Sequence, residues 1–480
     1  MLFNSLEFLV FFPLVVMLYF MLSFKWRMPM LLLASYYFYM CWKPVFAFLM
    51  FFTTFISYIS SHGVDKSKSI RAKKLWVAFS LVVNLGILFI FKYYNFFNES
   101  MRSLATHMNI PYGLPSLDLL LPVGISFYTF QALSYTIDVY RGDQKVEPKF
   151  WRFVLFVSFF PQLVAGPIER STNLLPQFYI KHKFDPTRAS YGLKRMMIGF
   201  FKKVVVADRI SAVVNSVYNN PHEYTGTYLI VATIMFAFQI YCDFSGYTDI
   251  AIGAAKVMGF DLMENFKRPY FSKDIVEFWR RWHISLSTWF KDYLYIPLGG
   301  SRKGKFRHYQ NIMIIFLVSG LWHGASWNFV IWGFLHGIYQ VLFLLTSKFR
   351  KALSNILNLD KIPIIPNLFR IIITFIAVDF AWIFFRANSF SDAIYIIKNL
   401  FVFTTPFEPS KLGITDFSFQ VGVGAIILME LIHFFQRSEK SYKIFMKFPL
   451  PIRWVAYYGL ILVILVFGAF GSGEFIYFQF

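Results

Sequence analysis

Long apolar runs, separated by short connections that carry Lys and Arg, constrain this chain more than any other feature of its sequence. Leu75 to Phe97 is one such run, and the loop before it, His62 to Lys74, holds five basic residues. A helix of about 20 apolar residues is long enough to cross the hydrocarbon core of a bilayer. With 57% hydrophobic and only 15% charged residues, the chain has more apolar surface than a soluble fold can bury. The sequence therefore predicts an all-α polytopic membrane protein.

The formal net charge of +21 does not indicate a nucleic-acid partner, because the Lys and Arg residues lie in short loops between apolar runs. In membrane proteins this pattern encodes orientation, with basic loops in the cytoplasm. The loop His62 to Lys74 is therefore expected inside, and the polar connection Asn98 to Pro115, which has one Arg, outside. Cys41 and Cys242 have no ligand-like neighbours in sequence, so neither a disulfide framework nor a metal site is predicted.

The apolar runs predict one membrane domain, residues 1–480, with about eleven spans and no internal repeat. Leu2 to Phe24 lacks a preceding positive charge and is interpreted as a retained first span with its N-terminus outside. Met28 to Tyr39 is too short to cross and is expected to re-enter or to lie in the interface. The other expected spans are near 45–61, 75–97, 117–139, 151–165, 191–218, 227–258, 309–323, 327–347, 367–385, 417–435 and 454–470. Basic clusters interpreted as further cytoplasmic signals are 181–183, 202–203, 267–268, 302–307 and 348–351.

Four of the nine histidines lie between Trp279 and Gly337, and three of them, His283, His323 and His336, lie among tryptophans and glycines. A neutral imidazole at His323, in LWHGASW, could take a proton from a hydroxyl, but a core histidine bonded to a carbonyl explains the spacing equally well. His283, in RRWHISLS, could be a second polar group at the same site, although a helix-surface histidine is the simpler interpretation. His336, in WGFLHG, is explained by helix packing beside two glycines.

Asp243 and Asp249 are the acidic groups of another apolar run, QIYCDFSGYTDIAIGAAKVMGF. Six residues on a regular helix separate two side chains by about 600°, so the two carboxylates would face different directions. This argues against a carboxylate pair for acid/base chemistry and favours helix packing with local hydrogen bonds. The chain contains no P-loop, dinucleotide fingerprint or H-E-x-x-H motif.

Five segments, in this order, closely resemble the membrane-bound O-acyltransferase family. They are LPVGISFYTFQALSYTIDVYRG, FFPQLVAGPIER, DFSGYTDIAIGAAKVMGF, FWRRWHISLSTWFKDYLYIPLGG and LWHGASWNFVIWGFLHG. The resemblance covers most of a motif-rich core, residues 115–340. Within the family it points to the bacterial alginate O-acetyltransferase branch, which includes peptidoglycan O-acetyltransferases and is related to the teichoic-acid D-alanyl transfer protein.

The resemblance implies helices around a central funnel in a bacterial cytoplasmic membrane. It maps the family's essential histidine onto His323, as general base, and the upstream polar partner onto His283. The implied reaction moves an acyl group, most simply acetyl, from a cytoplasmic thioester such as acetyl-CoA to a hydroxyl of an extracytoplasmic polysaccharide. No tightly bound cofactor is implied, and a hydrolase-like acetyltransferase outside the membrane is the implied protein partner.

Several alternatives remain open at this stage. D-alanyl transfer from a carrier protein to teichoic acid would use a related enzyme, and a transporter or flippase would also explain the hydropathy, though it should show inverted halves. The basic loop Arg302 to Arg307 could attract the phosphates of a CoA or carrier, or could serve orientation alone.

The C-terminal tail, residues 471–480, ends in four aromatic residues out of six. Basic residues before the last span place the start of that span inside, so the tail is expected to emerge outside and to fold back toward mid-depth. The tail resembles an aromatic acylation motif of this family in which a tyrosine accepts the acyl group, and this assigns Tyr477 as a candidate catalytic residue. An aromatic anchor at the membrane interface is the alternative.

Overall fold

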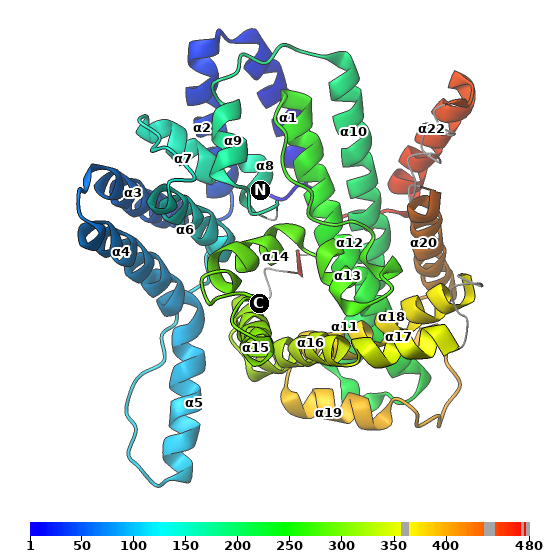
Figure 1. The fold of residues 1–480 in the computed structure, drawn as a ribbon. Helices are drawn as coiled ribbons and strands as arrows, with labels where there is room; N and C mark the ends of the chain where they lie inside the picture. The colour runs from blue at the N-terminus through cyan, green and yellow to red at the C-terminus, as the bar shows by residue number, and fades with distance from the viewer. Residues whose placement is uncertain (165, 357–363, 436–446, 472–474, 477–480) are drawn as a thin grey trace. The chain divides into compact units, whose positions relative to one another are not determined.

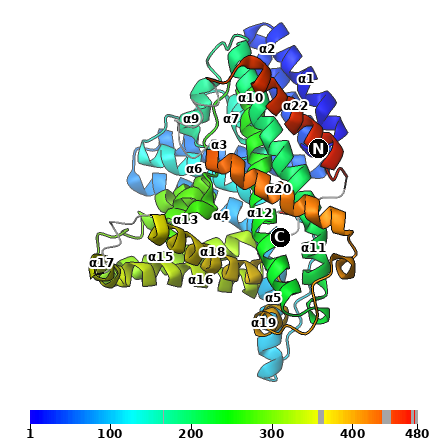
Figure 2. The same cartoon turned by 90° about the vertical axis from the view of Figure 1, so that its right-hand side faces the viewer.

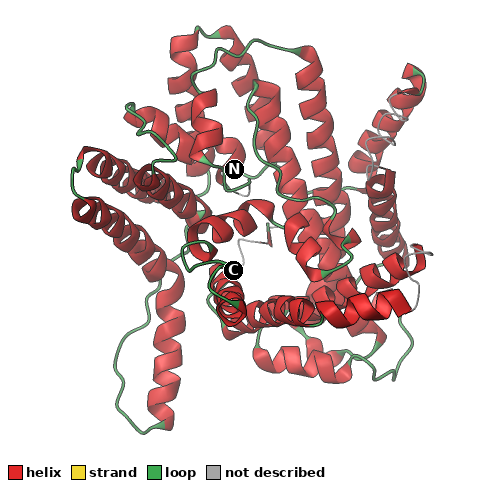
Figure 3. Cartoon of the chain, in the orientation of Figure 1, coloured by secondary structure: helices red, strands yellow, loops and turns green. Residues whose placement is uncertain are grey.

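Helices make up nearly all of the regular structure in the computed structural model, which describes residues 1–164, 166–356, 364–435, 447–471 and 475–476 (Figure 3). No β-strand occurs in these ranges. Seven of the helices seen there are long and apolar enough to cross a membrane, and Leu6–Met21 is a shorter apolar helix. The predicted all-α polytopic class is confirmed, whereas the predicted number of eleven spans is not.

The chain divides into two compact units. Unit 1 comprises Met1–Met196, Ile250–Glu264 and Gly324–Ser326, and unit 2 comprises Met197–Asp249, Asn265–His323 and Trp327–Phe480. The single membrane domain and its central funnel stay predictions.

Unit 1 holds the helices from the first residues of the chain up to α10 (Figure 1). They are α1 (Leu6–Met21), α2 (Phe24–Met40), α3 (Val45–Lys66), α4 (Ile70–Leu88), η1 (Phe89–Tyr93), α5 (Tyr94–His107), α6 (Ile125–Arg141), α7 (Phe150–Ser158), α8 (Phe160–Leu163), α9 (Ser171–Gln177) and most of α10 (Pro186–Phe200).

Unit 2 holds the later helices. The longer ones are α11 (Asp208–Asn219), α12 (Thr227–Met258, up to residue 249), α15 (Lys305–His323), α16 (Trp327–Leu345), α17 (Ser347–Ile356), α18 (Ile364–Arg386), α19 (Phe390–Asn399), α20 (Asp416–Phe435) and α22 (Leu450–Phe467). The shorter ones are η2 (Phe201–Ala207), η3 (Pro221–Glu223), η4 (Pro269–Phe271), α13 (Ile275–Arg281), α14 (Ile284–Phe290), η5 (Lys291–Tyr295) and η7 (Pro409–Leu412).

Small polar side chains line the contact between α3, α4 and α6 in unit 1. Asn84 donates hydrogen bonds to the Oγ of Ser57 at 3.2 Å and to the carbonyl oxygen of Ser80 at 2.8 Å. All three residues are fully buried. Small and polar residues of this kind allow helices to approach closely where water is absent.

Three predicted segments of unit 1 have different bounds in the structure. The helix Ile70–His107 is continuous for 38 residues, so the predicted outer loop begins ten residues too early. The predicted span 151–165 is broken into α7 and α8. The predicted span 117–139 begins as a helix only after Gly124, whose φ of +74° suits glycine. In each case apolar composition was mistaken for continuous helix, or a polar stretch for loop.

The helices of unit 2 agree more closely with the bounds predicted from the sequence. The structure confirms the helix predicted over 227–258 as α12. Helices α15 and α16 lie side by side in both views (Figures 1 and 2). Their backbones touch at two glycines, because a Cβ on Gly320 or Gly333 would lie 2.2 Å from the carbonyl oxygen of Phe329 or Phe316. This contact fixes the helix that carries His323.

Candidate active site

His323 is the last residue of α15 and is surrounded by aromatic rings. Only 3% of it is exposed to solvent. The centroid of its ring lies 4.9 Å from that of Trp322, 5.0 Å from that of Trp332 and 5.4 Å from that of Phe385. These rings give the imidazole a surrounding of low polarity.

His283 lies between α13 and α14, directly before the first residue of α14. Its φ of +42° and ψ of +55° are left-handed, a conformation that non-glycine residues rarely adopt and that tends to persist at functional sites. The side chain is fully buried, and its Nδ1 lies 3.1 Å from Oδ1 of Asn265. Burial lowers the pKa of His283 to about 3, so the ring is neutral at physiological pH.

The structure brings His283 and His323 together within unit 2. Their ring centroids are 6.4 Å apart at an interplanar angle of 64°, and the ring of Trp322 contacts both. Two imidazoles that are 40 residues apart in sequence thus belong to one buried aromatic cluster. This cluster is the candidate active site.

Asn265 is a member of the site that the sequence did not single out. Its Oδ1 accepts hydrogen bonds from the backbone N–H of Ser285 at 3.2 Å and from its hydroxyl at 2.9 Å. The same oxygen faces His283, so Asn265 orients the imidazole and braces the start of α14. A lone Asn in a loop carries no motif that would have revealed this role.

His336 lies in an adjoining part of the same core but makes a different contact. The indole N–H of Trp279 donates to its Nδ1 at 3.3 Å, and its ring lies 4.9 Å from that of Trp332. Its position beside Gly333 and Gly337 on α16 agrees with the predicted packing role.

Asp243 and Asp249 are both ion-paired, each with its own lysine. Nζ of Lys202 lies 2.8 Å from Oδ2 of Asp249, and Nζ of Lys203 lies 2.6 Å from Oδ1 of Asp243. The two lysines come from η2, a π-helix, and both are buried. The interpretation of residues 202–203 as a cytoplasmic loop signal is therefore wrong, since their charges neutralise carboxylates inside the protein.

Part of the predicted C-terminal tail folds back into unit 2. Phe475 and Ile476 are buried, and the backbone N–H of Ile476 donates to Oδ2 of Asp243 at 2.7 Å. Tyr477 lies outside the described residues.

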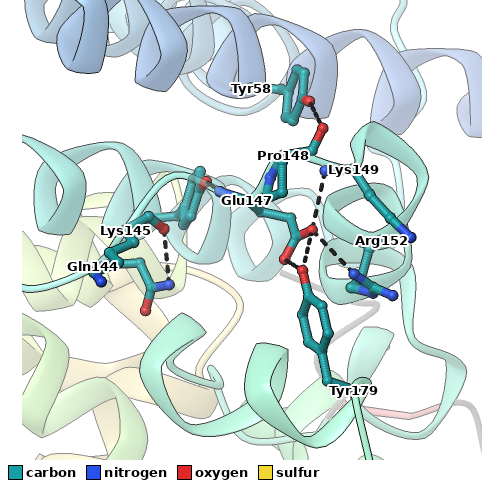
Figure 4. A network of polar contacts seen from close by, with 9 residues as sticks. Tyr58, Gln144, Lys145, Glu147, Pro148, Lys149, Arg152 and Tyr179 are labelled. Carbon is teal, nitrogen blue, oxygen red and sulfur yellow. Dashed lines mark hydrogen bonds and ion pairs between the residues drawn. The ribbon is translucent and has the colours of Figure 1, made fainter.

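Unit 1 has a separate polar network centred on Glu147, which the sequence also gave no reason to select (Figure 4). The hydroxyl of Tyr179 donates to both carboxylate oxygens at 2.8 and 2.9 Å, and the backbone N–H of Lys149 donates at 3.1 Å. Arg152 forms an ion pair with the same carboxylate at 3.5 Å and lies over the ring of Tyr179. Glu147 thus joins the loop before α7 to the segment after α9.

No group of three or more His, Cys, Asp or Glu side chains suited to a metal ion occurs among the residues with described positions. The basic loop Arg302 to Arg307 is exposed along its whole length and leads into α15. It is open to an anionic ligand, and nothing else in its geometry selects one.

The sequence pattern of the membrane-bound O-acyltransferase family, MBOAT, matches residues 143–385, which include His283 and His323. The chain belongs to this family. It is a multi-pass membrane enzyme that transfers acyl groups to hydroxyl oxygens.

The chain is similar to several bacterial acyltransferases, and two of the three described next match it over more than 80% of its length. It is 39% identical over 440 residues to "Probable alginate O-acetylase AlgI" of Pseudomonas aeruginosa, covering 90% of this chain and 80% of that protein. It is 33% identical over 437 residues to the peptidoglycan O-acetyltransferase of Helicobacter pylori, covering 83% and 80%. It is 28% identical over 249 residues to the teichoic acid D-alanyltransferase of Bacillus subtilis, covering 49% and 62%.

Proposed function

We propose that the protein acetylates hydroxyl groups of an extracytoplasmic polysaccharide, using acetyl-CoA or another cytoplasmic thioester as donor, from the cytoplasmic membrane of a bacterium. The observation that carries the chemistry is the pairing of His283 and His323 in one buried aromatic cluster. The choice of acetyl and polysaccharide rests on the relatives, since the two named as acting on alginate and peptidoglycan align over more than 80% of this chain.

In this proposal His323 is the general base. Its neutral imidazole accepts the proton of the attacking hydroxyl while the hydroxyl oxygen bonds to the thioester carbonyl carbon. The C–S bond then breaks, and the departing thiolate takes the proton from the imidazolium. His283, whose Nδ1 faces the side-chain oxygen of Asn265, positions the acyl group.

Tyr477 has two possible roles within this scheme. As a relay it would accept the acetyl group as a phenyl ester and pass it to the sugar, and as an anchor it would only hold the tail. A phenol, with a pKa of about 10, is a better leaving group than a sugar hydroxyl, so a relay would lie between thioester and sugar ester in energy. In the Tyr477→Phe variant, normal acetylation would support the anchor, and loss of acetylation would support the relay.

D-alanyl transfer to teichoic acid is the second candidate, supported by the match to the D-alanyltransferase over half of the chain. Mass spectrometry of envelope glycans, with and without the gene, separates the two. We expect the deletion to remove O-acetyl groups from a polysaccharide and the wild-type gene to restore them. Loss of D-alanyl esters instead would refute the acetyl proposal. An extracytoplasmic hydrolase-like acetyltransferase is the proposed partner, which receives or delivers the group outside.

The assignment of donor and acceptor faces has its own test. A cysteine at position 68, between α3 and α4, should react only with reagents that enter the cytoplasm, and one at position 112 only with reagents outside. Both substitutions use a chain in which Cys41 and Cys242 are replaced. Labelling of both from the same side would contradict the proposed faces.

A further inference from the structure

The C-terminal segment contacts the rest of unit 2 at two points, one on η2 and one on α12. The backbone N–H of Ala469 donates to the carbonyl oxygen of Val204 at 2.8 Å. Seven residues later, the backbone N–H of Ile476 donates to Asp243 at 2.7 Å. Val204 directly follows Lys203, which pairs with Asp243, so both points belong to η2 and its partner on α12. π-Helices are rare and are often found at functional sites.

The carboxylate of Asp243 can accept more hydrogen bonds than Lys203 donates to it. Lys203 lies between two carboxylates, since its Nζ is 2.6 Å from Asp243 and 2.8 Å from Asp208. A single buried cation is neutralised by one carboxylate. Lys203 faces Oδ1 of Asp243, which leaves Oδ2 to accept the hydrogen bond from the tail. A hydrogen bond from a backbone N–H to a buried carboxylate is one of the stronger kinds.

A chain of ring contacts runs from the attached tail to the candidate active site. The ring of Phe475 lies 4.5 Å from that of Tyr247 and 6.0 Å from that of Phe244. The ring of Phe244 in turn lies 4.7 Å from that of His283, edge to face. Phe475 is thus separated from His283 by one aromatic ring.

We propose that Asp243 is a positioning residue, which holds the C-terminal segment beside the His283 cluster through the backbone N–H of Ile476. Lys203 fixes the carboxylate, and Phe475 packs against α12 to align the segment. The attachment follows from the geometry alone. Its effect on catalysis rests on the proposed acetyl transfer.

Amide hydrogen exchange, followed by mass spectrometry of C-terminal peptides from the full chain in detergent, tests the attachment. We expect a slowly exchanging amide at Ile476 in the wild type, and at least a tenfold faster exchange in Asp243→Ala. Asp243→Asn keeps an acceptor oxygen and should restore much of the protection. Exchange as slow in Asp243→Ala as in the wild type would overturn the proposal.

The other ion pair between η2 and α12 offers a matched control. The double variant Lys202→Met/Asp249→Leu removes a whole buried pair from these helices without leaving an isolated charge. We expect it to leave exchange at Ile476 unchanged. Equal acceleration in this variant would show that general loosening, rather than loss of the Asp243 contact, releases the tail, and the proposal would fall.

The catalytic half of the proposal is tested with two variants that break the same contact from opposite sides. Ile476→Pro removes the N–H and leaves Asp243 and Lys203 intact, while Ile476→Val keeps the N–H. We expect Asp243→Ala and Ile476→Pro to lower kcat about equally, at least tenfold, with KM for acetyl-CoA within twofold of the wild type. Ile476→Val should be active. Faster exchange at Ile476 with unchanged kcat would overturn the positioning role while leaving the proposed acetyl transfer untouched.

Discussion

The side chains around Glu147 in unit 1 and those around His323 in unit 2 are of opposite kinds. In unit 1 the carboxylate of Glu147 is surrounded by donors, namely Tyr179, a backbone N–H and Arg152, and these contacts join two segments of the chain. In unit 2 the imidazole of His323 is surrounded by aromatic rings. A carboxylate committed to several donors serves to stabilise a loop. Rings around an imidazole exclude water from it without supplying a charge, a surrounding that suits the role of general base proposed for His323.

The largest expected effect is that of His323→Ala. Loss of a general base lowers the rate by about 10²- to 10⁴-fold, and the truncated ring leaves a cavity that does not prevent folding. Acetyl transfer should be lost, although the variant is expressed at the normal level and elutes normally from a size-exclusion column in detergent. Acetylation of the polymer at the wild-type level by this variant would contradict the role of His323 as general base.

His283→Ala should come next, with kcat lower by about 100-fold, as is typical when a reacting group is no longer held in position. Asn265→Ala should reproduce part of this loss, because the His283 ring would no longer be oriented. Kinetics of both variants and of the double variant check the link. If the two losses multiply as independent effects, Asn265 does not act through His283.

His336→Ala sharpens the comparison within unit 2, since this histidine is as buried as His283 but has a donor in Trp279. We expect a stability loss of about 2–4 kcal/mol from the cavity and the unpaired indole N–H. Activity per folded molecule should stay within about threefold of the wild type, a small change compared with the loss of a catalytic base. Thermal unfolding in detergent, measured beside activity, separates the two. A stable but inactive variant would place His336 in the site.

The smallest effect is expected for Glu147→Gln. The variant keeps the shape and one acceptor oxygen, and loses the ion pair with Arg152. Stability should fall by about 1 kcal/mol, in line with the net contribution of a typical hydrogen bond, and kcat should not change. The control Tyr179→Phe removes the hydroxyl donor and should give a loss of similar size. A large drop in kcat for either variant would show that unit 1 has a chemical role that its contacts do not suggest.

Much of the helical architecture could be predicted, because hydropathy reports directly on which residues avoid water. The bounds of α12 agree with the prediction, and those of α16 and α20 differ by at most two residues. The prediction was wrong where composition and backbone conformation diverge. Residues 117–124 are apolar without being helical, and 98–107 are polar yet form the end of a long helix.

The candidate site could be predicted only in part. The motifs around His283 and His323 named the two imidazoles, and the structure places them together. Spacing on one helix could not reveal the partners of Asp243 and Asp249, because these lie on η2, about 40 residues earlier. The same reason hides Asn265, whose meaning depends on a contact across the fold.

The unbroken helix from Ile70 to His107 has a practical consequence for imaging. Its 38 residues follow a helical path of about 57 Å at about 1.5 Å per residue, almost twice the roughly 30 Å thickness of a hydrocarbon core. The helix changes direction at the π-helix η1, so α4 and α5 run in different directions (Figure 1). Its last 14 residues, α5, are braced by the loop that follows, as Asn95 and Asn98 donate to Leu117 and Pro115. Together with its bracing loop, α5 gives a particle embedded in a lipid disc an asymmetric landmark. Electron cryomicroscopy could use it to align particles of an enzyme of only 56.5 kDa.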